Sequence, residues 1–538
     1  MSNPSTIPAT TPHPDNINHP ARDEYHGVVV MDQHRWLEDG DDPAVRAWTD
    51  AQNRRARHHL DALEGRADVL AQLTALFAQV TPSYSDPVAR PCGLFGFKFQ
   101  PPKQQRLLVT MASANDPGSE KIVLDPNEIE PKGHVAIDWF VPSPDGTLVA
   151  VCLSEYGSEV GTLHFYHTET GLALPDRIPR VQYPTGCGSA AWEPDGLGIF
   201  YTRYPHPDER PSADLGFYQQ IHRHRLGTPD ASDEYAVGHG FPRIAGTVLT
   251  ASRDGGWLLA SVANGDGGEF AHWLLDMRQA DPSAWRQITR FDDSVKQVAF
   301  GHDGTVLYLR SVQGAPRGKI LRLPTDGSVA LADAPVLVPE GDAVIERLVV
   351  TASHLYLSEM TGGPSRVRRF DLMGGDACEL PIPAGCGVMD LLALADHDAD
   401  DRVLYRLTSY TEPDAWHLYD PAADSGAGRS AKTALFNTSP VDLSDIEVLR
   451  EFAVSKDGAR IPVNILRRKG TPLDGNNPTL LQGYGGYGHC MRPQFNGTLR
   501  LWFDRGGIYV MANLRGGGEY GTEWHLNGNL TRKQNVFD

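Results

Sequence analysis

The chain has 538 residues, of which 40% are apolar and 9% aromatic, which is enough for a sizeable core divided among about two to four domains. Its 49 basic and 68 acidic residues give a net charge of −19, so we expect neither nucleic acid nor a membrane surface as a partner. Six cysteines without a C-x-x-C pair, a polar N-terminus and the lack of a long apolar run predict a cytoplasmic protein with reduced thiols.

Two helices are predicted near the N-terminus. Asp42 followed by Pro43 is typical of a helix start, and apolar residues at helical spacing continue to about residue 62. A second helix is predicted over 66–79, with an apolar face that we expect to pack in a core. That face consists of Val69, Leu70, Leu73, Leu76 and Phe77. Residues 1–85 are therefore assigned to an N-terminal helical segment that lies outside the following repeat.

Short β-rich runs recur at a nearly constant interval between about residues 88 and 435. Seven turn-then-strand starts lie 48 to 59 residues apart, and most units carry another strand downstream. The starts are Cys92-Gly93, Asp145-Gly146, Asp195-Gly196, Asp254-Gly255, Asp303-Gly304, Ser353-His354 and Asp401-Arg402. Asp-Gly suits a tight hairpin because glycine adopts a positive φ without steric cost.

Units of this length and pattern are typical of propeller blades, each a sheet of four antiparallel strands. The repeat therefore predicts a seven-bladed β-propeller, which we assign to residues 86–438. The alternative architecture is a pair of β-sandwiches. A sandwich gives no reason for a fixed interval, so the regular spacing favours the propeller.

The pattern changes after the repeat. Apolar runs there are separated by glycine-rich loops, and helical signal begins near Lys533. The predicted strands are 447–454, 460–466, 479–481 and 508–512. The first two flank Lys456-Asp457-Gly458 and should form a hairpin. Residues 439–538 are thus predicted to be the opening strands of an α/β domain that is cut off, and this part is expected to be aggregation-prone.

Motifs at both ends of the chain resemble the prolyl oligopeptidase family. The N-terminal ones are YHG at 25–27, RWLED at 35–39 and AQN at 51–53. The C-terminal ones are GYGGY at 483–487, ANLRGGGEYG at 512–521, WH at 524–525 and KQN at 533–535. The resemblance runs colinearly from about residue 23 to 538 and is weakest through the propeller. Differences from the usual motifs, at Asp32-Gln33-His34, Gln482 and Tyr487, bear on substrate preference.

The resemblance implies a propeller over an α/β-hydrolase domain that is assembled from both termini. This arrangement accounts for helices before the propeller and strands after it. The implied activity is that of a serine-type endopeptidase that cleaves short proline-containing peptides after proline, with the propeller excluding folded proteins.

The resemblance also assigns two site residues. The family's catalytic serine lies in a G-x-S-x-G elbow shortly beyond 533–535, and no such elbow occurs in this sequence, so serine, aspartate and histidine are all expected to be absent. The chain should therefore be inactive alone. Tyr484 matches the family's phenolic oxyanion donor, and is otherwise a packing residue. Tyr183, within RVQY at 180–183, matches an aromatic directed toward substrate, and is otherwise an ordinary strand residue.

Other candidate chemistry is weaker. Arg515 and the three glycines after it lack the lysine and the βαβ context of a phosphate-binding loop. The closest histidine spacings, His58-His59 and His222-x-His224, are poor metal-ligand pairs without acidic partners. We therefore expect no cofactor and no metal. A non-catalytic propeller that binds peptides is the alternative function, and the sequence leaves the physiological substrate and the oligomeric state open.

Overall fold

The computed structural model describes residues 20–78, 81–279, 281–394, 400–423 and 428–538, and the chain divides into two compact units, Met1–Ala78 and Gln79–Asp538. The elements of the first unit are the hairpin β1 (Ala21–Tyr25) and β2 (Val28–Asp32), the 3-10 helix η1 (Arg35–Glu38), and helices α1 (Pro43–Asp61) and α2 (Arg66–Phe77).

The two predicted helices are confirmed, but the predicted core packing of α2 is not. The Asp42 carboxylate caps α1 by accepting a hydrogen bond from the Ala44 N–H at 2.8 Å. No residue of α2 is buried, and Leu70 and Phe77 are 52% and 58% exposed. Two helices and one hairpin are too few elements to enclose an apolar face within this unit. Gln79, the predicted end of α2, lies outside the described residues.

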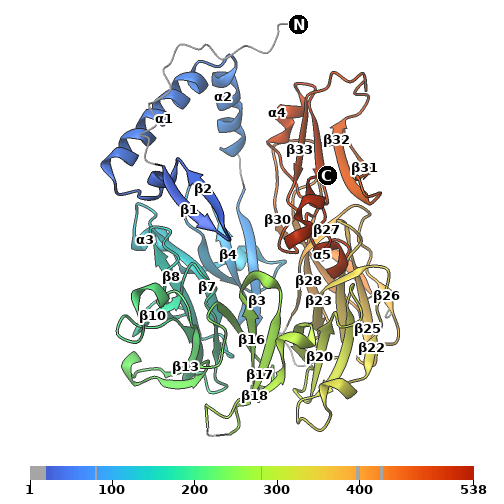
Figure 1. The fold of residues 1–538 in the computed structure, drawn as a ribbon. Helices are drawn as coiled ribbons and strands as arrows, with labels where there is room; N and C mark the ends of the chain where they lie inside the picture. Colours follow the sequence, from blue (N-terminus) through green and yellow to red (C-terminus); the bar gives the residue numbers. More distant parts are fainter. Residues whose placement is uncertain (1–19, 79–80, 280, 395–399, 424–427) are drawn as a thin grey trace. The chain divides into compact units, whose positions relative to one another are not determined.

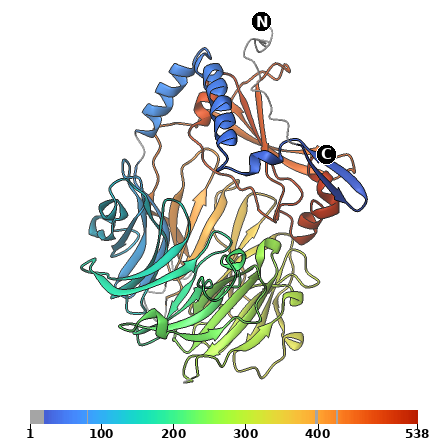
Figure 2. The ribbon, with the colours of Figure 1, turned by 60° about the vertical axis from the view of Figure 1, so that its left-hand side comes forward.

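The second unit begins with seven four-stranded antiparallel sheets in the described part of residues 83–436, each made of strands that follow one another in the chain. Blades 1 to 4 are β3 (Ser83–Arg90), β4 (Gly93–Phe99), β5 (Leu107–Met111), β6 (Lys121–Leu124); β7 (Val135–Pro142), β8 (Leu148–Glu155), β9 (Gly161–His167), β10 (Ala173–Gln182); β11 (Ala190–Trp192), β12 (Gly198–Arg203), β13 (Gln220–Arg225), β14 (Glu234–Val237); β15 (Ala245–Ala251), β16 (Trp257–Asn264), β17 (Phe270–Asp276) and β18 (Arg286–Thr289). Blades 5 to 7 are β19 (Val295–Phe300), β20 (Val306–Ser311), β21 (Lys319–Pro324), β22 (Val336–Val338); β23 (Val344–Val350), β24 (His354–Met360), β25 (Ser365–Asp371), β26 (Cys378–Glu379); β27 (Gly387–Ala393), β28 (Val403–Thr408), β29 (Ala415–Asp420) and β30 (Arg429–Phe436). The short helix α3 (Pro126–Ile129) connects the first two blades. The sheets follow one another round a ring in chain order (Figures 1 and 2), so the seven-bladed propeller is confirmed.

Each predicted start lies at the turn between the first and second strand of a blade. At the four Asp-Gly turns the glycine has a φ between 67° and 75°, the left-handed conformation that the hairpin requires. In the second blade the Asp145 carboxylate also accepts a hydrogen bond from the Thr147 N–H at 3.0 Å. Local turn chemistry therefore accounts for the repeat.

One hydrophobic cluster lies between each pair of neighbouring blades. Blade 1 packs against blade 2 through residues such as Phe95 and Val149. The ring closes where Leu107 of blade 1 joins Leu404 and Trp416 of blade 7 in one cluster, and the Trp416 indole N–H donates to the Tyr84 carbonyl at 3.1 Å. Side-chain packing closes the ring, since each sheet contains strands of one blade only.

A mixed sheet follows the propeller. Its elements are β31 (Ile446–Val454), β32 (Arg460–Arg468), β33 (Thr479–Gly483), α4 (Leu499–Phe503), β34 (Ile508–Ala512), α5 (Thr522–Leu526) and the 3-10 helix η9 (Leu530–Val536). The strand order is β31-β32-β34-β33, in which β33 and β34 are parallel and the other pairs antiparallel. The predicted hairpin around Gly458 and all four predicted strands are confirmed.

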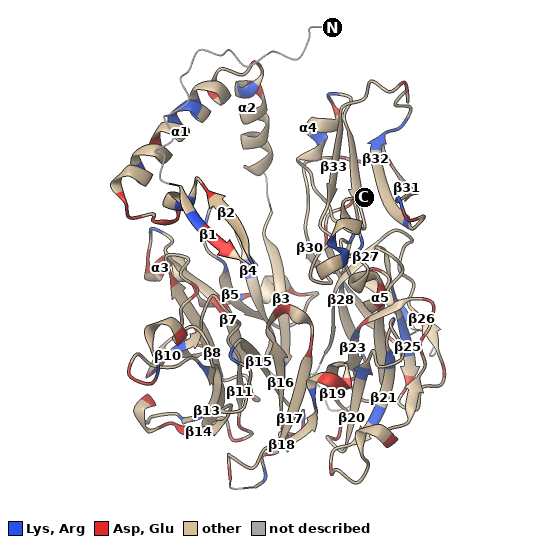
Figure 3. Ribbon diagram, in the orientation of Figure 1, with Lys and Arg blue, Asp and Glu red and all other residues tan. Residues whose placement is uncertain are grey.

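The three-segment division at 85/86 and 438/439 stays a prediction, because the propeller and the mixed sheet fall within one compact unit. The first blade begins at Ser83 and the last ends at Phe436. Acidic and basic residues are scattered along the strands and turns of the blades (Figure 3). Among the described helices, none is long and apolar enough to cross a membrane.

Candidate functional site

Tyr484 directly follows β33, at the carboxyl end of the parallel pair β33 and β34. In that pair Gly483 is opposite Ala512, so the loops that leave the two strands start at the same edge of the sheet. Such an edge is where ligands usually bind in α/β sheets. The Tyr484 side chain is 54% exposed and its ring contacts the His489 ring edge-on, with centroids 5.3 Å apart. The phenol is therefore held at the sheet edge and open to a ligand.

The glycine-rich loop brings three sequence motifs together. A Cβ added at Gly485, whose φ is +66°, would lie 2.4 Å from Val536 and 3.0 Å from the Arg515 carbonyl, so only glycine fits. The Lys533 ammonium donates to the Gly485 carbonyl at 2.6 Å, and the Gly488 N–H donates to the Gly516 carbonyl at 2.9 Å. These contacts bring GYGGY, ANLRGGGEYG and KQN together at one edge of the sheet.

Arg515 is a structural residue in this arrangement. Its guanidinium is 5% exposed, forms an ion pair with Asp457, and donates to the Ser455 hydroxyl at 2.9 Å and to the Asn535 carbonyl at 3.0 Å. The hydrogen bond from Arg515 lowers the pKa of the Asp457 carboxyl. With the guanidinium buried and both of its terminal nitrogens committed in this way, Arg515 is not presented to a phosphate group.

Glu519 and Asn513 hold the loop through hydrogen bonds to Met491, a role that their motif ANLRGGGEYG alone does not indicate. The Glu519 carboxylate, 1% exposed, accepts hydrogen bonds from the Met491 N–H at 2.9 Å and from the Asn513 amide at 3.3 Å. The same amide donates to the Met491 carbonyl at 2.7 Å. Burial raises the pKa of Glu519. A carboxyl within an otherwise glycine-rich and apolar run was the signal that could have identified this support.

Tyr183 lies just after β10, in a tight turn closed by a bridge to Gly186. Its half-buried ring is 5.8 Å from the Tyr204 ring and 5.3 Å from the Arg180 guanidinium, by centroid distances. A Cβ at Gly216 would lie 2.5 Å from the ring, so the backbone passes close to it. Among the described residues, the structure records no contact between Tyr183 and Tyr484.

The histidine pair in β13 has a structural role. His224 is 1% exposed and lies between Asp233 at 2.7 Å and Asp176 at 3.2 Å, so the expectation that it has no acidic partner is wrong. Burial alone would lower the pKa of His224, but the two aspartates outweigh it and raise the pKa. His222 instead contacts the Arg203 guanidinium at 3.2 Å, and burial lowers the pKa of His222 to about 4. The described residues contain no group of three side chains suited to a metal ion.

Comparisons with known proteins point to one family. Residues 14–428 match the family model described as prolyl oligopeptidase, N-terminal beta-propeller domain, and residues 493–538 match the prolyl oligopeptidase family. The chain is similar to a prolyl endopeptidase of Elizabethkingia miricola, with 26% identity over 531 residues that cover 98% of this chain and 71% of the relative.

Two further relatives illustrate the range of activities. A dual function macrocyclase-peptidase of Amanita bisporigera is 23% identical over 538 residues, which cover 95% of this chain and 71% of the relative. A solved structure from a study of two prolyl endopeptidases and their inter-domain dynamics superposes with a TM-score of 0.86 at 29% identity, covering 100% of this chain and 75% of that one.

Proposed function

The chain belongs to the prolyl oligopeptidase family, and from this premise we propose that it is part of a serine-type oligopeptidase that cleaves short peptides after proline. The observation that carries the proposal is the placement of Tyr484, a half-exposed phenol on a glycine-rich loop at the carboxyl edge of β33 and β34. We further propose a cytoplasmic setting, supported by six cysteines that are all free thiols.

In this proposal Tyr484 acts when the substrate carbonyl becomes a tetrahedral oxyanion. Its hydroxyl donates a hydrogen bond to the oxyanion, and a backbone N–H beside the nucleophile supplies the second donor. The sequence holds no G-x-S-x-G elbow, so we assign no nucleophilic serine, general base or orienting carboxylate within these 538 residues. We therefore propose that this polypeptide alone has no peptidase activity.

Tyr183 is proposed to contact the substrate from the propeller. Its ring lies between the Arg180 guanidinium and the Tyr204 ring, which leaves it half-buried and held in one orientation. A fixed aromatic of this kind suits stacking against a proline ring. We also propose the restriction to short peptides, which the closed ring of seven blades supports.

The test uses a chimera in which this chain is joined to the remaining C-terminal part of the Elizabethkingia miricola prolyl endopeptidase. Tyr484→Phe should lower kcat by about 10²-fold or more with little change in KM, because the donor strengthens its bond only as charge develops. Tyr487→Phe is the matched control, since Tyr487 is on the same loop and 75% exposed, and it should change kcat by less than about twofold. The substrate is a proline-linked fluorogenic peptide, and linear and cyclic products are both quantified.

Turnover by the 538-residue chain without the C-terminal extension would contradict the proposal if it persists in controls with an inhibitor of the active-site serine. An unchanged kcat in Tyr484→Phe would also contradict it.

The closed propeller also favours the second candidate, a peptide-binding module without catalysis. Binding of a proline-containing peptide by the 538-residue chain, combined with an inactive chimera, would support that candidate instead.

A further inference from the structure

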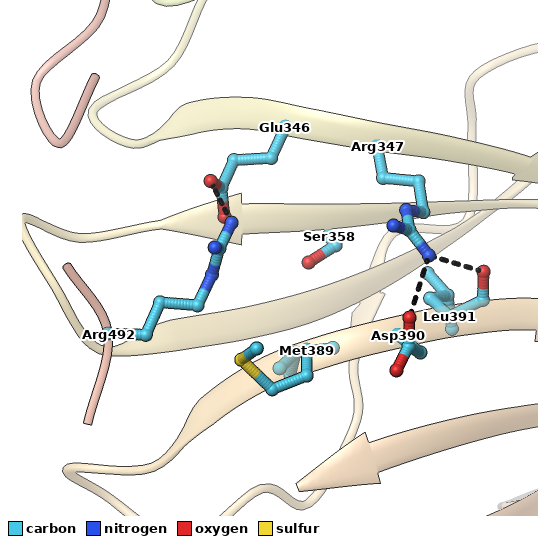
Figure 4. A pocket seen from close by; sticks show the side chains of 8 residues that line it. Glu346, Arg347, Ser358, Met389, Asp390, Leu391 and Arg492 are labelled. Carbon is cyan, nitrogen blue, oxygen red and sulfur yellow. Dashed lines mark hydrogen bonds and ion pairs between the residues drawn. The ribbon is translucent and has the colours of Figure 1, made fainter. Parts of the chain in front are cut away.

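Two ion pairs flank a polar cavity of about 130 Å³ between the first strands of blades 6 and 7 (Figure 4). One pair stays within the propeller, because Arg347 of β23 lies 3.7 Å from the Asp390 carboxylate of β27. The other leaves it, because the neighbouring Glu346 accepts a hydrogen bond at 2.5 Å from Arg492, a residue of the loop that follows Tyr484. The cavity thus places side by side an ion pair that joins two blades and one that joins a blade to the candidate site.

A bulge in β23 makes the second pair possible. The register of β23 against β24 shifts between Ile345 and Arg347, so Glu346 is the extra residue. In a regular strand Glu346 and Arg347 would point to opposite faces, but both line the cavity. The bulge therefore directs the Glu346 carboxylate toward the loop that carries Arg492.

The environment of Glu346 makes its pairing important. The side chain is 14% exposed, and burial raises the pKa of Glu346 while the charges of Arg492 and Arg310 act in the opposite direction. Arg310 donates to the Ile345 carbonyl at 3.1 Å, and burial lowers the pKa of Arg310 to about 10. Removing one partner of such a pair leaves the other charge poorly solvated, which costs more than losing an exposed ion pair.

Two neighbouring residues of the loop, Met491 and Arg492, are hydrogen-bonded to different parts of the molecule. Met491 is bonded through its N–H to Glu519 and through its carbonyl to Asn513, at 2.9 Å and 2.7 Å. The next residue, Arg492, is bonded to Glu346 of blade 6. Two residues before Met491, the His489 ring contacts the Tyr484 ring. The path from the propeller strand to the phenol thus runs from Glu346 to Arg492, along the backbone to His489, and from its ring to Tyr484.

We propose that Glu346 is a positioning residue for Tyr484: through Arg492 it fixes the loop 484–493, so a propeller strand sets the orientation of the phenol at the sheet edge. The catalytic meaning of this coupling rests on the proposed function of Tyr484. The positioning itself does not, and it can be measured without turnover.

The experiment uses the 538-residue chain with 3-fluorotyrosine at position 484. Glu346→Gln and Arg492→Gln should each speed amide hydrogen exchange in residues 489–492 by about tenfold or more and shift or broaden the ¹⁹F resonance of residue 484. The double variant should change these signals no more than either single variant, because both substitutions remove the same interaction and the double variant leaves neither charge unpaired. Asp390→Asn is the matched control: it removes the partner of Arg347 in the same cavity and should change these signals by less than about twofold.

Glu346→Asp, which keeps the charge, should restore part of the protection. If Glu346→Gln fails to fold, Arg492→Gln carries the test, since it leaves Glu346 beside Arg310. Unchanged exchange and an unchanged ¹⁹F signal in Arg492→Gln would overturn the proposal, and so would equal effects from Asp390→Asn. In the chimeric peptidase Arg492→Gln should lower kcat more than it raises KM. A moved resonance together with full activity of Tyr484→Phe would refute the proposed function and leave the positioning intact.

Discussion

Inner strands of the propeller blades and the edge strand β33 of the following sheet are buried to very different degrees. All six residues of β12 are buried, as are all but the first of β24, whereas all five residues of β33 are exposed. Each blade has both faces covered by its neighbours in the ring. β33 is hydrogen-bonded only to β34, and Leu480 and Leu481 on it are 48% and 67% exposed.

The difference shows where the stability of this chain lies. Strands of similar apolar content contribute to a core only when other elements cover them, and in the propeller the repeat itself provides that cover. The candidate site is built on the less covered sheet, and its loop is held partly by the propeller through Arg492. The following predictions test this comparison.

The largest expected effect comes from a matched pair of truncations. Leu355→Ala in β24, where the side chain is fully buried between blades 5 and 6, should lower the free energy of unfolding by about 2–5 kcal/mol through lost burial and a cavity. Leu481→Ala in β33 should change it by less than about 0.5 kcal/mol, because the side chain is 67% exposed. Urea unfolding followed by tryptophan fluorescence measures both. Equal losses would show that the two regions are equally packed.

Acidification should weaken the propeller. His272 of β17 is fully buried, its Nδ1 lies 2.6 Å from the Thr289 hydroxyl, and burial lowers the pKa of His272 from 6.5 to about 4. Below pH about 6.5 His272 is protonated in the unfolded state but stays neutral in the folded state. The contribution of His272 to the free energy of unfolding is therefore full above that pH and is lost as the pH falls toward 4. The loss is about 3 kcal/mol at most for this histidine.

His272→Gln should flatten the unfolding free energy between pH 7 and 4 relative to the parent chain. The contribution of Glu519 to stability has the opposite pH dependence, because burial raises the pKa of Glu519. This contribution is full below the pKa of the unfolded state and is lost as the pH rises through the pKa of the folded state. The strands β31–β34 contain no histidine. An unchanged pH profile in His272→Gln would contradict the assigned burial effect.

The smallest effect on stability should accompany a clear change in association. Leu481→Lys places a charge on the exposed strand β33 and should reduce concentration-dependent self-association while changing the unfolding free energy by less than about 0.5 kcal/mol. Leu197→Lys is the control, since Leu197 is 55% exposed in a blade turn. Sedimentation velocity over a range of concentrations measures the self-association of both variants. Identical behaviour of the two variants would mean that β33 is not the associating surface.

Much of the fold could be predicted because its determinants are local. The Asp-Gly turns specify the hairpin between the first and second strand in four of the seven blades, since the glycine φ near +70° depends on the turn itself. Asp42 caps α1 through a residue two positions away, and the hairpin at Gly458 pairs adjacent strands. Tyr484 was identified differently, through the resemblance of GYGGY at 483–487 to a family motif, and its position at the sheet edge comes from the structure.

Contacts between residues distant in the chain could not be predicted, because they depend on ring closure and strand register. Asp176 and His224 are 48 residues apart and meet only when blades 2 and 3 pack together. Glu346 and Arg492 are 146 residues apart, and the bulge that joins them has no signal in the local pattern. The apolar stripe of α2 predicted burial that the structure does not show, since periodicity identifies an apolar face but not what covers it. The sequence by itself thus determined the turns, strands and helices through interactions between near neighbours, and the tertiary structure alone decided which of their faces meet.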